Sequence, residues 1–228
     1  MQKKYELTSN TIVKFGRTLY QIKALFSFDV VSKGDFGGYI ENEENLSQDG
    51  NAWVFGNAWV FGNARVYGNA RVYGNARVYG NARVYGNAWV YGNARVYGDA
   101  RVYGNARVYG DARVYGNAWV FGNAWISGNA RVYGNAMVSG DAWISGNARV
   151  YGNADFLLVG RIGSRAAFTT FFKNKSGGIQ VACGCFLGTL AEFREKVKET
   201  HGNNKHAKMY NLAADMAELQ ILGDKSEV

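Results

Sequence analysis

The sequence predicts a mainly β protein organised around a solenoid, and three features of the chain indicate this fold class. Glycine recurs at every sixth position from Gly50 to Gly152, so seventeen complete six-residue units follow one another. In every unit, one slot is always Ala and another is always Val or Ile. Proline is absent, which suits strands whose backbone N–H groups are needed for pairing. A short period held over about a hundred residues is typical of a solenoid.

Each unit consists of a short strand and a corner. In the unit that begins at Ala70, alternation places Ala70 and Val72 on one face and Arg71 and Tyr73 on the other. The glycine and asparagine that follow form the corner, because these two residue types adopt the left-handed backbone region most readily. We therefore expect Ala and Val to point inward, and Arg or Trp to point outward.

The pattern Val-x-x-x-Ala-x with Gly-Asn corners resembles the hexapeptide repeat of left-handed parallel β-helices. The resemblance implies three units per triangular coil, and therefore about six coils.

We predict a β-hairpin and capping coil over residues 1–49, the hexapeptide-repeat β-helix over residues 50–154, and a small α+β domain over residues 155–228. In the cap, Ile40 and Leu46 are expected in the slot of Ala52. The parent family is commonly trimeric, so we expect a homo-oligomer such as a trimer.

With three units per coil, the outward residues of every third unit lie above one another, so the outward residues form three columns along the rod. One column holds five consecutive arginines beside tyrosines; we call it the arginine face, and its candidate binding residues are Arg77, Arg95, Arg113, Arg131, Arg149, Tyr97 and Tyr115. Coils about 4.8 Å apart bring these like charges close together, and cation–π contacts with the tyrosines could offset their repulsion. Such a ladder could bind nucleic acid or another anionic ligand. Duplication of one favourable outward pair would also produce it, so both interpretations stay open.

The last segment predicts strands over residues 157–162, 167–172 and 179–185, followed by two helices. A capping box at Thr189 begins the first helix, and Gly202 ends it. The second helix runs from about His206 to Leu222. Its predicted apolar side holds Met209, Leu212, Ala213, Met216 and Leu219.

All cysteines and histidines of the chain lie in this segment. Cys183, Cys185, His201 and His206 could together hold zinc, or a cysteine and a histidine could form a nucleophilic pair. The alternative is that the cysteines act as small buried apolar side chains, so we predict no cofactor and keep zinc as the alternative. Arg161, Ser164 and Arg165 could line a ligand pocket, although a solvated surface would explain them equally well.

The hexapeptide superfamily includes acyltransferases and γ-type carbonic anhydrases, which are expected to need histidine as a base or a zinc ligand. This chain has no histidine before His201, and no loop interrupts its repeats. We therefore predict a non-enzymatic scaffold whose C-terminal domain recognises a partner protein or a small ligand. The alternatives are binding of nucleic acid or another anionic ligand, and an acyltransferase-like, zinc or Cys–His enzyme with its site in the C-terminal domain.

Charge and composition bear on partners and location. The net charge is +8, and residues 50–154 contribute ten Arg against three Asp. Two cysteines one residue apart fit a reducing compartment, and no apolar run of membrane-spanning length occurs.

The Gly37-Gly38-Tyr39-Ile40-Glu41 and Cys183-Gly184-Cys185-Phe186 segments resemble those of bacterial and prophage proteins called hexapeptide-repeat transferases. We expect a protein of the cytoplasm of a bacterial or phage-infected cell, without a membrane partner.

Overall fold

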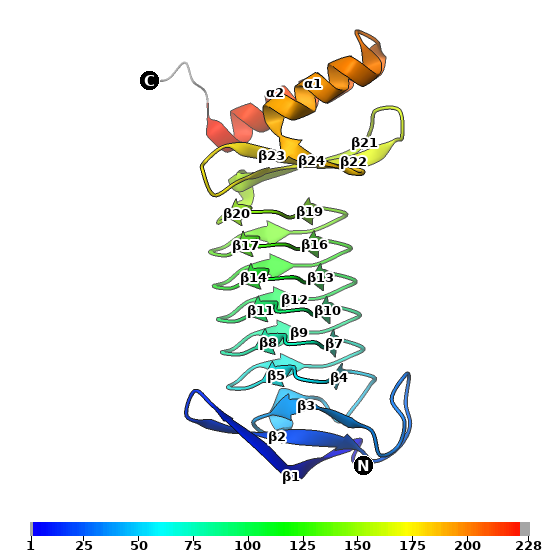
Figure 1. Ribbon diagram of the computed structural model, residues 1–228, viewed down its shortest axis with the longest axis vertical. Coiled ribbons are helices and arrows are strands. Elements are labelled where there is room, and N and C mark those ends of the chain that lie inside the picture. Colours follow the sequence, from blue (N-terminus) through cyan, green and yellow to red (C-terminus); the bar gives the residue numbers. More distant parts are fainter. Residues whose placement is uncertain (1, 224–228) are drawn as a thin grey trace.

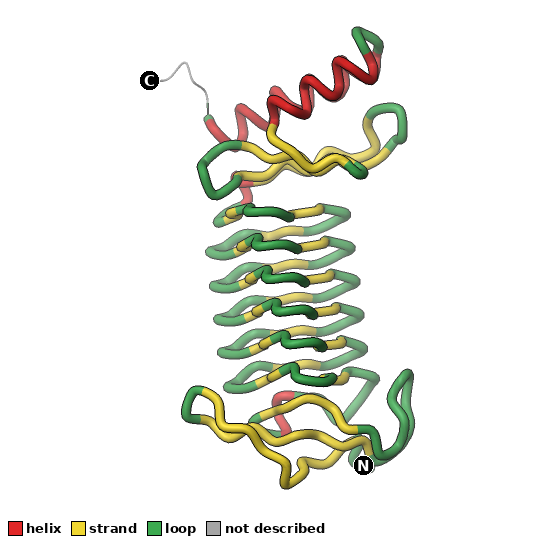
Figure 2. The backbone as a smooth tube through the Cα atoms, viewed as in Figure 1, coloured by secondary structure: helices red, strands yellow, loops and turns green. Residues whose placement is uncertain are grey.

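Seventeen two-residue strands, from β4 to β20, follow one another at six-residue intervals in the computed structural model, which describes residues 2–223. They stack into three parallel sheets and form a rod of about six coils, with short strands joined by loops in every coil (Figures 1 and 2). The prediction of a mainly β solenoid is confirmed.

Each sheet collects every third strand. The first holds β5 (Trp59–Val60), β8 (Arg77–Val78), β11 (Arg95–Val96), β14 (Arg113–Val114), β17 (Arg131–Val132) and β20 (Arg149–Val150). The second holds β4 (Trp53–Val54), β7 (Arg71–Val72), β10 (Trp89–Val90), β13 (Arg107–Val108), β16 (Trp125–Ile126) and β19 (Trp143–Ile144). The third holds β6 (Arg65–Val66), β9 (Arg83–Val84), β12 (Arg101–Val102), β15 (Trp119–Val120) and β18 (Met137–Val138).

Strand pairing follows the predicted coil length. Arg95 pairs with Arg113, eighteen positions further on, and the Ala and Val or Ile slots of all coils are buried in one continuous core. The third column ends at Met137. Asp155, eighteen positions further on, lies in the 3-10 turn η2 (Asn153–Asp155), where its carboxylate accepts hydrogen bonds from the backbone N–H groups of Tyr151 and Gly152.

The N-terminal strands extend the first sheet of the solenoid. The hairpin of β1 (Tyr5–Lys14) and β2 (Arg17–Ala24) is antiparallel, and β3 (Phe36–Ile40) pairs with both β2 and β5. Ile40 aligns with Val60 and Leu46 with Val66, so the expected match to the Ala52 slot was wrong by two residues. Both side chains still point inward, because a shift of two positions keeps a residue on the same face of a strand.

A buried lysine closes this end of the rod. The Lys4 Nζ donates to the carbonyl oxygens of Gly50 at 3.2 Å and of Ala52 at 2.9 Å, near the 3-10 turn η1 (Glu43–Asn45). Burial lowers the pKa of Lys4 from its usual value of 10.5 to about 8. The ammonium form therefore still predominates at neutral pH and satisfies carbonyls of the first coil.

The other end carries an antiparallel sheet covered by two helices. Its strands are β21 (Phe156–Ile162), β22 (Ala167–Lys173), β23 (Ile179–Cys183) and β24 (Phe186–Thr189), followed by α1 (Leu190–His201) and α2 (Lys205–Leu222). Alternation along β22 packs Phe172 against the solenoid core and Phe171 against the helices. The sheet thus lies between solenoid and helices (Figure 1).

Two predictions for this region were wrong. The strand expected through Cys185 ends at Cys183, because Gly184 has φ +59° and starts a turn into the unpredicted strand β24. The side of α2 that we expected in the core is mostly exposed: Met209, Leu212, Met216 and Leu219 face outward, whereas Ala213 is buried. The helix instead buries Ala207, Tyr210, Ala214, Ala217 and Ile221, whose small alanines permit close approach.

Candidate functional site

A pocket of about 390 Å³ lies where the β21–β22 and β23–β24 turns meet α1 and α2. Phe186, Phe193 and Val197 form its apolar part. Arg165 and Lys196 add positive charge, and its polar and sulfur-bearing members are Ser164, Thr200, His201, Tyr210, Cys183 and Cys185. No carboxylate lines this pocket in the described part of the chain. It therefore favours an anion that carries an apolar group.

Glycine backbone geometry shapes the pocket. Gly163 has φ +74°, and a Cβ there would overlap with the Tyr210 hydroxyl, so only glycine allows the turn to pass under this ring. At Gly184, a Cβ would lie 3.2 Å from an Arg165 guanidinium nitrogen. The two turns therefore bring Arg165, Tyr210 and Cys183 to one place.

Cys183 and Tyr210 form the polar centre of the pocket. The Thr169 hydroxyl donates to Cys183 Sγ at 3.2 Å. Burial, together with the neighbouring Cys183, raises the pKa of Tyr210 to about 12, and Arg165 opposes this shift. Tyr210 is therefore protonated at neutral pH and keeps an O–H group that can donate a hydrogen bond.

The structure brings together several residues that the sequence suggested for separate roles. Cys183, Cys185, His201, Ser164 and Arg165 all line the pocket, whereas His206 and Arg161 do not. The His201 ring lies 5.7 Å from the Tyr210 ring and 5.8 Å from the His206 ring, measured between centroids. Across residues 2–223, no group of three or more His, Cys, Asp or Glu side chains could hold a metal ion.

Sequence reasoning did not single out Lys196, Thr200 and Tyr210 as pocket residues. Lys196 and Thr200 are four positions apart on α1, so they share a face beside the apolar stripe of Phe193 and Val197. That spacing was a usable signal. Tyr210 carried none, because its place depends on how α2 folds back over Gly163.

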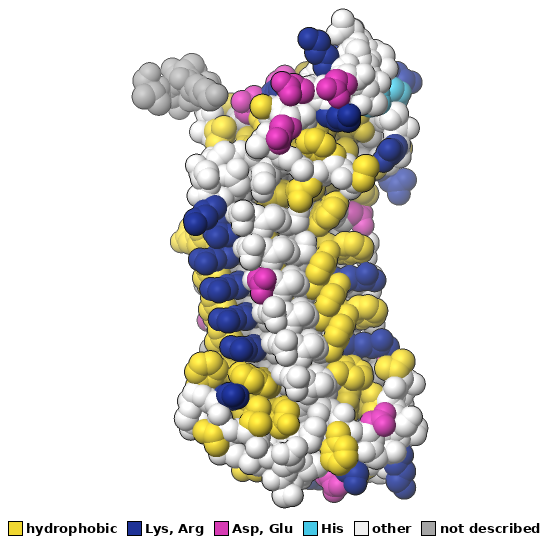
Figure 3. All heavy atoms as spheres, viewed as in Figure 1, with side chains coloured by type: hydrophobic (Ala, Val, Ile, Leu, Met, Phe, Trp, Pro, Cys, Tyr) yellow, Lys and Arg dark blue, Asp and Glu magenta, His cyan; other side chains and the backbone are white. Residues whose placement is uncertain are grey.

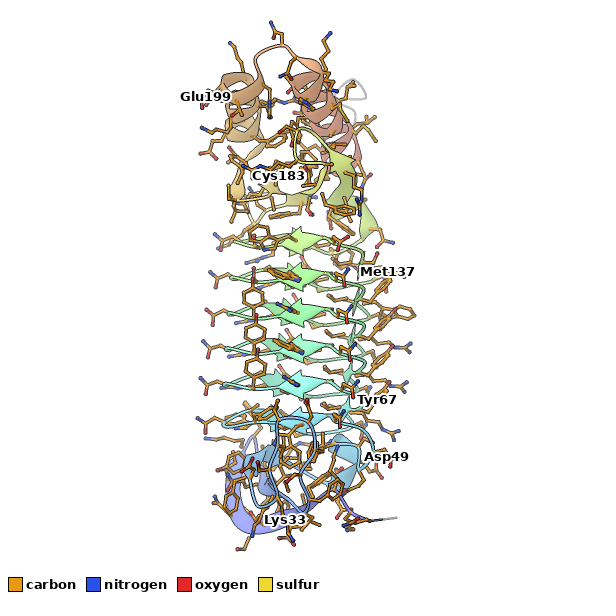
Figure 4. The ribbon with its side chains drawn as sticks, turned by 90° about the vertical axis from the view of Figure 1, so that its right-hand side faces the viewer. Lys33, Asp49, Tyr67, Met137, Cys183 and Glu199 are labelled. Atoms are coloured by element: carbon orange, nitrogen blue, oxygen red, sulfur yellow. The ribbon has the colours of Figure 1, made fainter. Side chains whose placement is uncertain are left out.

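The arginine face forms a regular column along one side of the rod (Figure 3). Pairing places Arg77, Arg95 and Arg113 side by side, and Arg131 and Arg149 continue the column. The neighbouring aromatic rings stack in order from Phe61 through Tyr79, Tyr97 and Tyr115 to Tyr133, with centroids 4.8–5.0 Å apart. A column of such stacked rings is visible in Figure 4.

The expected cation–π contacts between arginine and tyrosine were not found in residues 2–223; arginine pairs with tryptophan instead. The Arg77 guanidinium lies 4.5 Å from the Trp59 ring, and Trp89 lies between Arg71 and Arg107. The reason is geometric: residues in the same slot of successive coils are direct cross-strand neighbours, and tyrosine therefore meets tyrosine.

The arginines of the face differ in how their charge is satisfied. Arg149 donates to the carbonyl oxygens of Asn129 and Ala148 at 3.1 and 2.8 Å. Within residues 2–223, Arg95, Arg113 and Arg131 form no ion pair, whereas Arg71, which lies in another column, pairs with Asp29. Positive charge thus remains uncompensated along the middle of this face.

Comparison with known proteins supports the repeat architecture. The model described as the YdcK β-solenoid repeat matches residues 64–78, 76–92, 88–103, 100–114, 112–128, 124–140, 130–146 and 142–154. No curated protein matches the chain. In the described part of the chain, the helices are too short or too polar to cross a membrane. The chain is a β-solenoid repeat protein whose coils are similar to the YdcK β-solenoid repeat.

Proposed function

We propose that the protein is a non-enzymatic β-solenoid scaffold whose C-terminal pocket binds a small anionic ligand with an apolar group. The observation that carries this proposal is the composition of the pocket, in which Arg165 stands beside Phe186 and Phe193 without any lining carboxylate, and Lys196, which also pairs with Glu199 at 3.0 Å, adds a second cation. The rod places this pocket at the end opposite Lys33 (Figure 4). The solenoid would thus hold the binding region at a set distance from the N-terminal strands.

Four interactions would hold such a ligand. The guanidinium of Arg165 can donate two parallel hydrogen bonds to a carboxylate or phosphate, and Lys196 adds a second positive charge. The protonated Tyr210 hydroxyl supplies a further donor. The apolar group of the ligand would pack on Phe186 and Phe193, where burial of apolar surface is favourable.

The surroundings of Cys183 support binding over catalysis. A Cys–His nucleophile needs an imidazole within hydrogen-bond reach of the thiol. Cys183 instead accepts a hydrogen bond from Thr169 and interacts with Tyr210, while the His201 ring stacks on Tyr210. His201 therefore acts as a wall of the pocket in this proposal.

Calorimetric titration with phenyl phosphate and with neutral benzyl alcohol tests the proposal. We expect phenyl phosphate to bind and benzyl alcohol to bind at least tenfold more weakly. Arg165→Gln and Lys196→Gln should each weaken phenyl phosphate binding about tenfold, since a hydrogen bond to a charged group is worth about 1.5–3 kcal/mol. Arg161→Gln and Lys198→Gln are matched controls outside the pocket and should bind like the unmodified protein. Equal binding of both probes, or equal losses in all four variants, would contradict the proposal.

A second candidate function is binding of an anionic polymer along the arginine face. The specific observation is that Arg95, Arg113 and Arg131 stand in one column without an ion-pair partner in the described chain. Binding of a fluorescent single-stranded oligothymidylate should weaken steeply with salt, because bound phosphates release counterions. It should be lost in Arg95→Glu with Arg113→Glu and kept in Arg65→Glu with Arg83→Glu, which changes charge equally on another face. Binding that is flat from low to high salt would exclude it.

A further inference from the structure

Helix α2 has an exposed apolar stripe on its outer side. Met209, Leu212, Met216 and Leu219 are 39, 64, 57 and 60 % exposed. The opposite side of the helix is buried against the sheet and α1. The helix thus has two apolar sides, and only one of them is covered within residues 2–223. Contiguous exposed apolar side chains of this kind mark an interaction surface.

The spacing of the stripe is that of a helix–helix seam. Its members are three, four and three positions apart, which is the spacing of apolar positions in a two-stranded coiled coil. The seam extends from Met209 to Leu219, and these ten residue steps correspond to about 15 Å of helix. A second helix with the same spacing would fit its side chains between these four.

We propose that the stripe is the contact surface for a second copy of the chain, with the two α2 helices antiparallel about a twofold axis. In this arrangement, Met209 packs on the partner's Leu219, and Leu212 packs on the partner's Met216. Every layer then combines one methionine with one leucine, so the stripe is complementary to itself, as a twofold contact requires. This contact is independent of the pocket and of the arginine face.

The charges on α2 select the antiparallel orientation. Lys205 and Lys208 lie in the first turns, whereas Asp215 and Glu218 lie in the second half. Both carboxylates also accept a hydrogen bond from Arg194 of α1, at 2.7 Å each. Antiparallel pairing sets the half of the helix that carries Lys205 and Lys208 alongside the half of the partner's helix that carries the carboxylates. Parallel pairing would instead set like charges side by side.

The position of α2 leaves room for this contact. The helices cover the face of the C-terminal sheet that lies away from the solenoid (Figure 1). Two copies joined through α2 would therefore extend their rods away from each other. The proposed assembly places two pockets and two solenoids at opposite ends of one elongated particle.

Light scattering coupled to size-exclusion chromatography of the full chain tests this proposal. At high protein concentration we expect a particle of twice the chain mass of 25.1 kDa, which dissociates on dilution because the seam is short. Leu212→Lys with Leu219→Lys should be monomeric at all concentrations with an unchanged circular dichroism spectrum, since both side chains are exposed. Leu187→Lys, at an exposed leucine outside the stripe, is the matched control and should remain dimeric.

Cross-linking tests the orientation. In a Cys185→Ser background, a mixture of Leu212→Cys and Met216→Cys chains should form a disulfide-linked heterodimer under mild oxidation. Neither variant alone should link, because antiparallel pairing sets position 212 against position 216. A monomer or trimer in solution, a dimer that survives the double lysine substitution, or cross-linking of Leu212→Cys alone would overturn the proposal.

Discussion

At the scale of single residues, the glycine in each unit determines how closely successive coils approach. Gly98 has φ +70°, and a Cβ there would lie 3.0 Å from the backbone nitrogen of Gly116. Gly56 has a comparable φ of +56°, but no atom lies within 4 Å of the position of its Cβ. The two positions therefore separate the effect of backbone conformation from that of close packing between coils.

We expect Gly98→Ala to destabilise the protein more than Gly56→Ala. Both substitutions place an L-residue in the left-handed region, which costs about 1–2 kcal/mol. Gly98→Ala adds a clash between coils, with an overpacking cost of about 1–3 kcal/mol. Guanidinium unfolding followed by circular dichroism would measure both. Equal midpoints would mean that the coils relax around the added methyl group.

At the scale of elements, ladders of like side chains couple one coil to the next. Corner amides form such a ladder, in which Asn69 donates to Asn87 at 3.1 Å and Asn87 donates to Asn105 at 3.2 Å. Tyrosine rings form another, and Tyr97 lies 4.8 Å from Tyr115 with parallel planes. These side-chain contacts add to the main-chain hydrogen bonds that hold the strands of each sheet together. The addition matters because each strand pairs with its neighbour over only two residues.

The tyrosine ladders should make the free energy of unfolding decrease at alkaline pH. Burial raises the pKa of Tyr79 and Tyr97 above the usual value of 10, and neighbouring tyrosines raise that of Tyr97 further. A raised pKa in the folded state means that the corresponding stability is present below pH 10 and is lost as pH rises above it. We therefore expect Tyr79→Phe with Tyr97→Phe to resist unfolding better than the unmodified protein at pH 11.

At pH 7 the same variant should unfold near the unmodified midpoint, because phenylalanine already stands in these ladders at Phe61 and Phe121. Denaturant midpoints at the two pH values provide the comparison. A stability difference between variant and unmodified protein that stays constant from pH 7 to pH 11 would show that tyrosine ionisation is not linked to unfolding here.

At the scale of the whole molecule, the coil of eighteen residues is the unit of length. Residues eighteen positions apart pair throughout the solenoid, and strand β22 of the C-terminal sheet contacts its last two strands, β19 and β20. A complete coil can therefore be removed without changing which side chains stack. Removal of a single six-residue unit would rotate everything beyond it by a third of a turn.

Deletion of residues 99–116 should keep the fold and shorten the rod by about 4.8 Å, the spacing of adjacent strands. Spin labels at Lys33→Cys and Glu199→Cys, in a Cys185→Ser background, would report the distance between the two ends. Deletion of residues 99–104, a single unit, is the matched control. It should rotate the C-terminal end by a third of a turn, which changes the distance between the labels and places Arg and Trp residues of different columns above one another. Loss of secondary structure in the eighteen-residue deletion would contradict the modular view.

The sequence was most informative where one unit repeats. The positions of Ala70 and Val72 hold only Ala and only Val or Ile in every unit, and this predicted that they point inward. The eighteen-residue coil predicted that Arg95 would lie beside Arg113. The reason is that each contact in the solenoid joins equivalent positions of neighbouring units, so one local pattern determines the entire core. Prediction was weaker in the C-terminal region, where no contact repeats.

The sequence by itself thus determined the repeat and its inward and outward positions, whereas the resemblance to hexapeptide-repeat β-helices supplied the coil length and with it the order of side chains along each column. The tertiary structure alone decided that α2 packs through Ala214 and Ala217 and leaves Leu212 exposed, and that Arg165, Cys183, His201 and Tyr210 share one pocket. Hydrophobicity ranks a leucine as more buried than an alanine, but close approach of a helix to a sheet favours the smaller side chain. Such a choice depends on the distance between two elements, and that distance is set only when the whole region is folded.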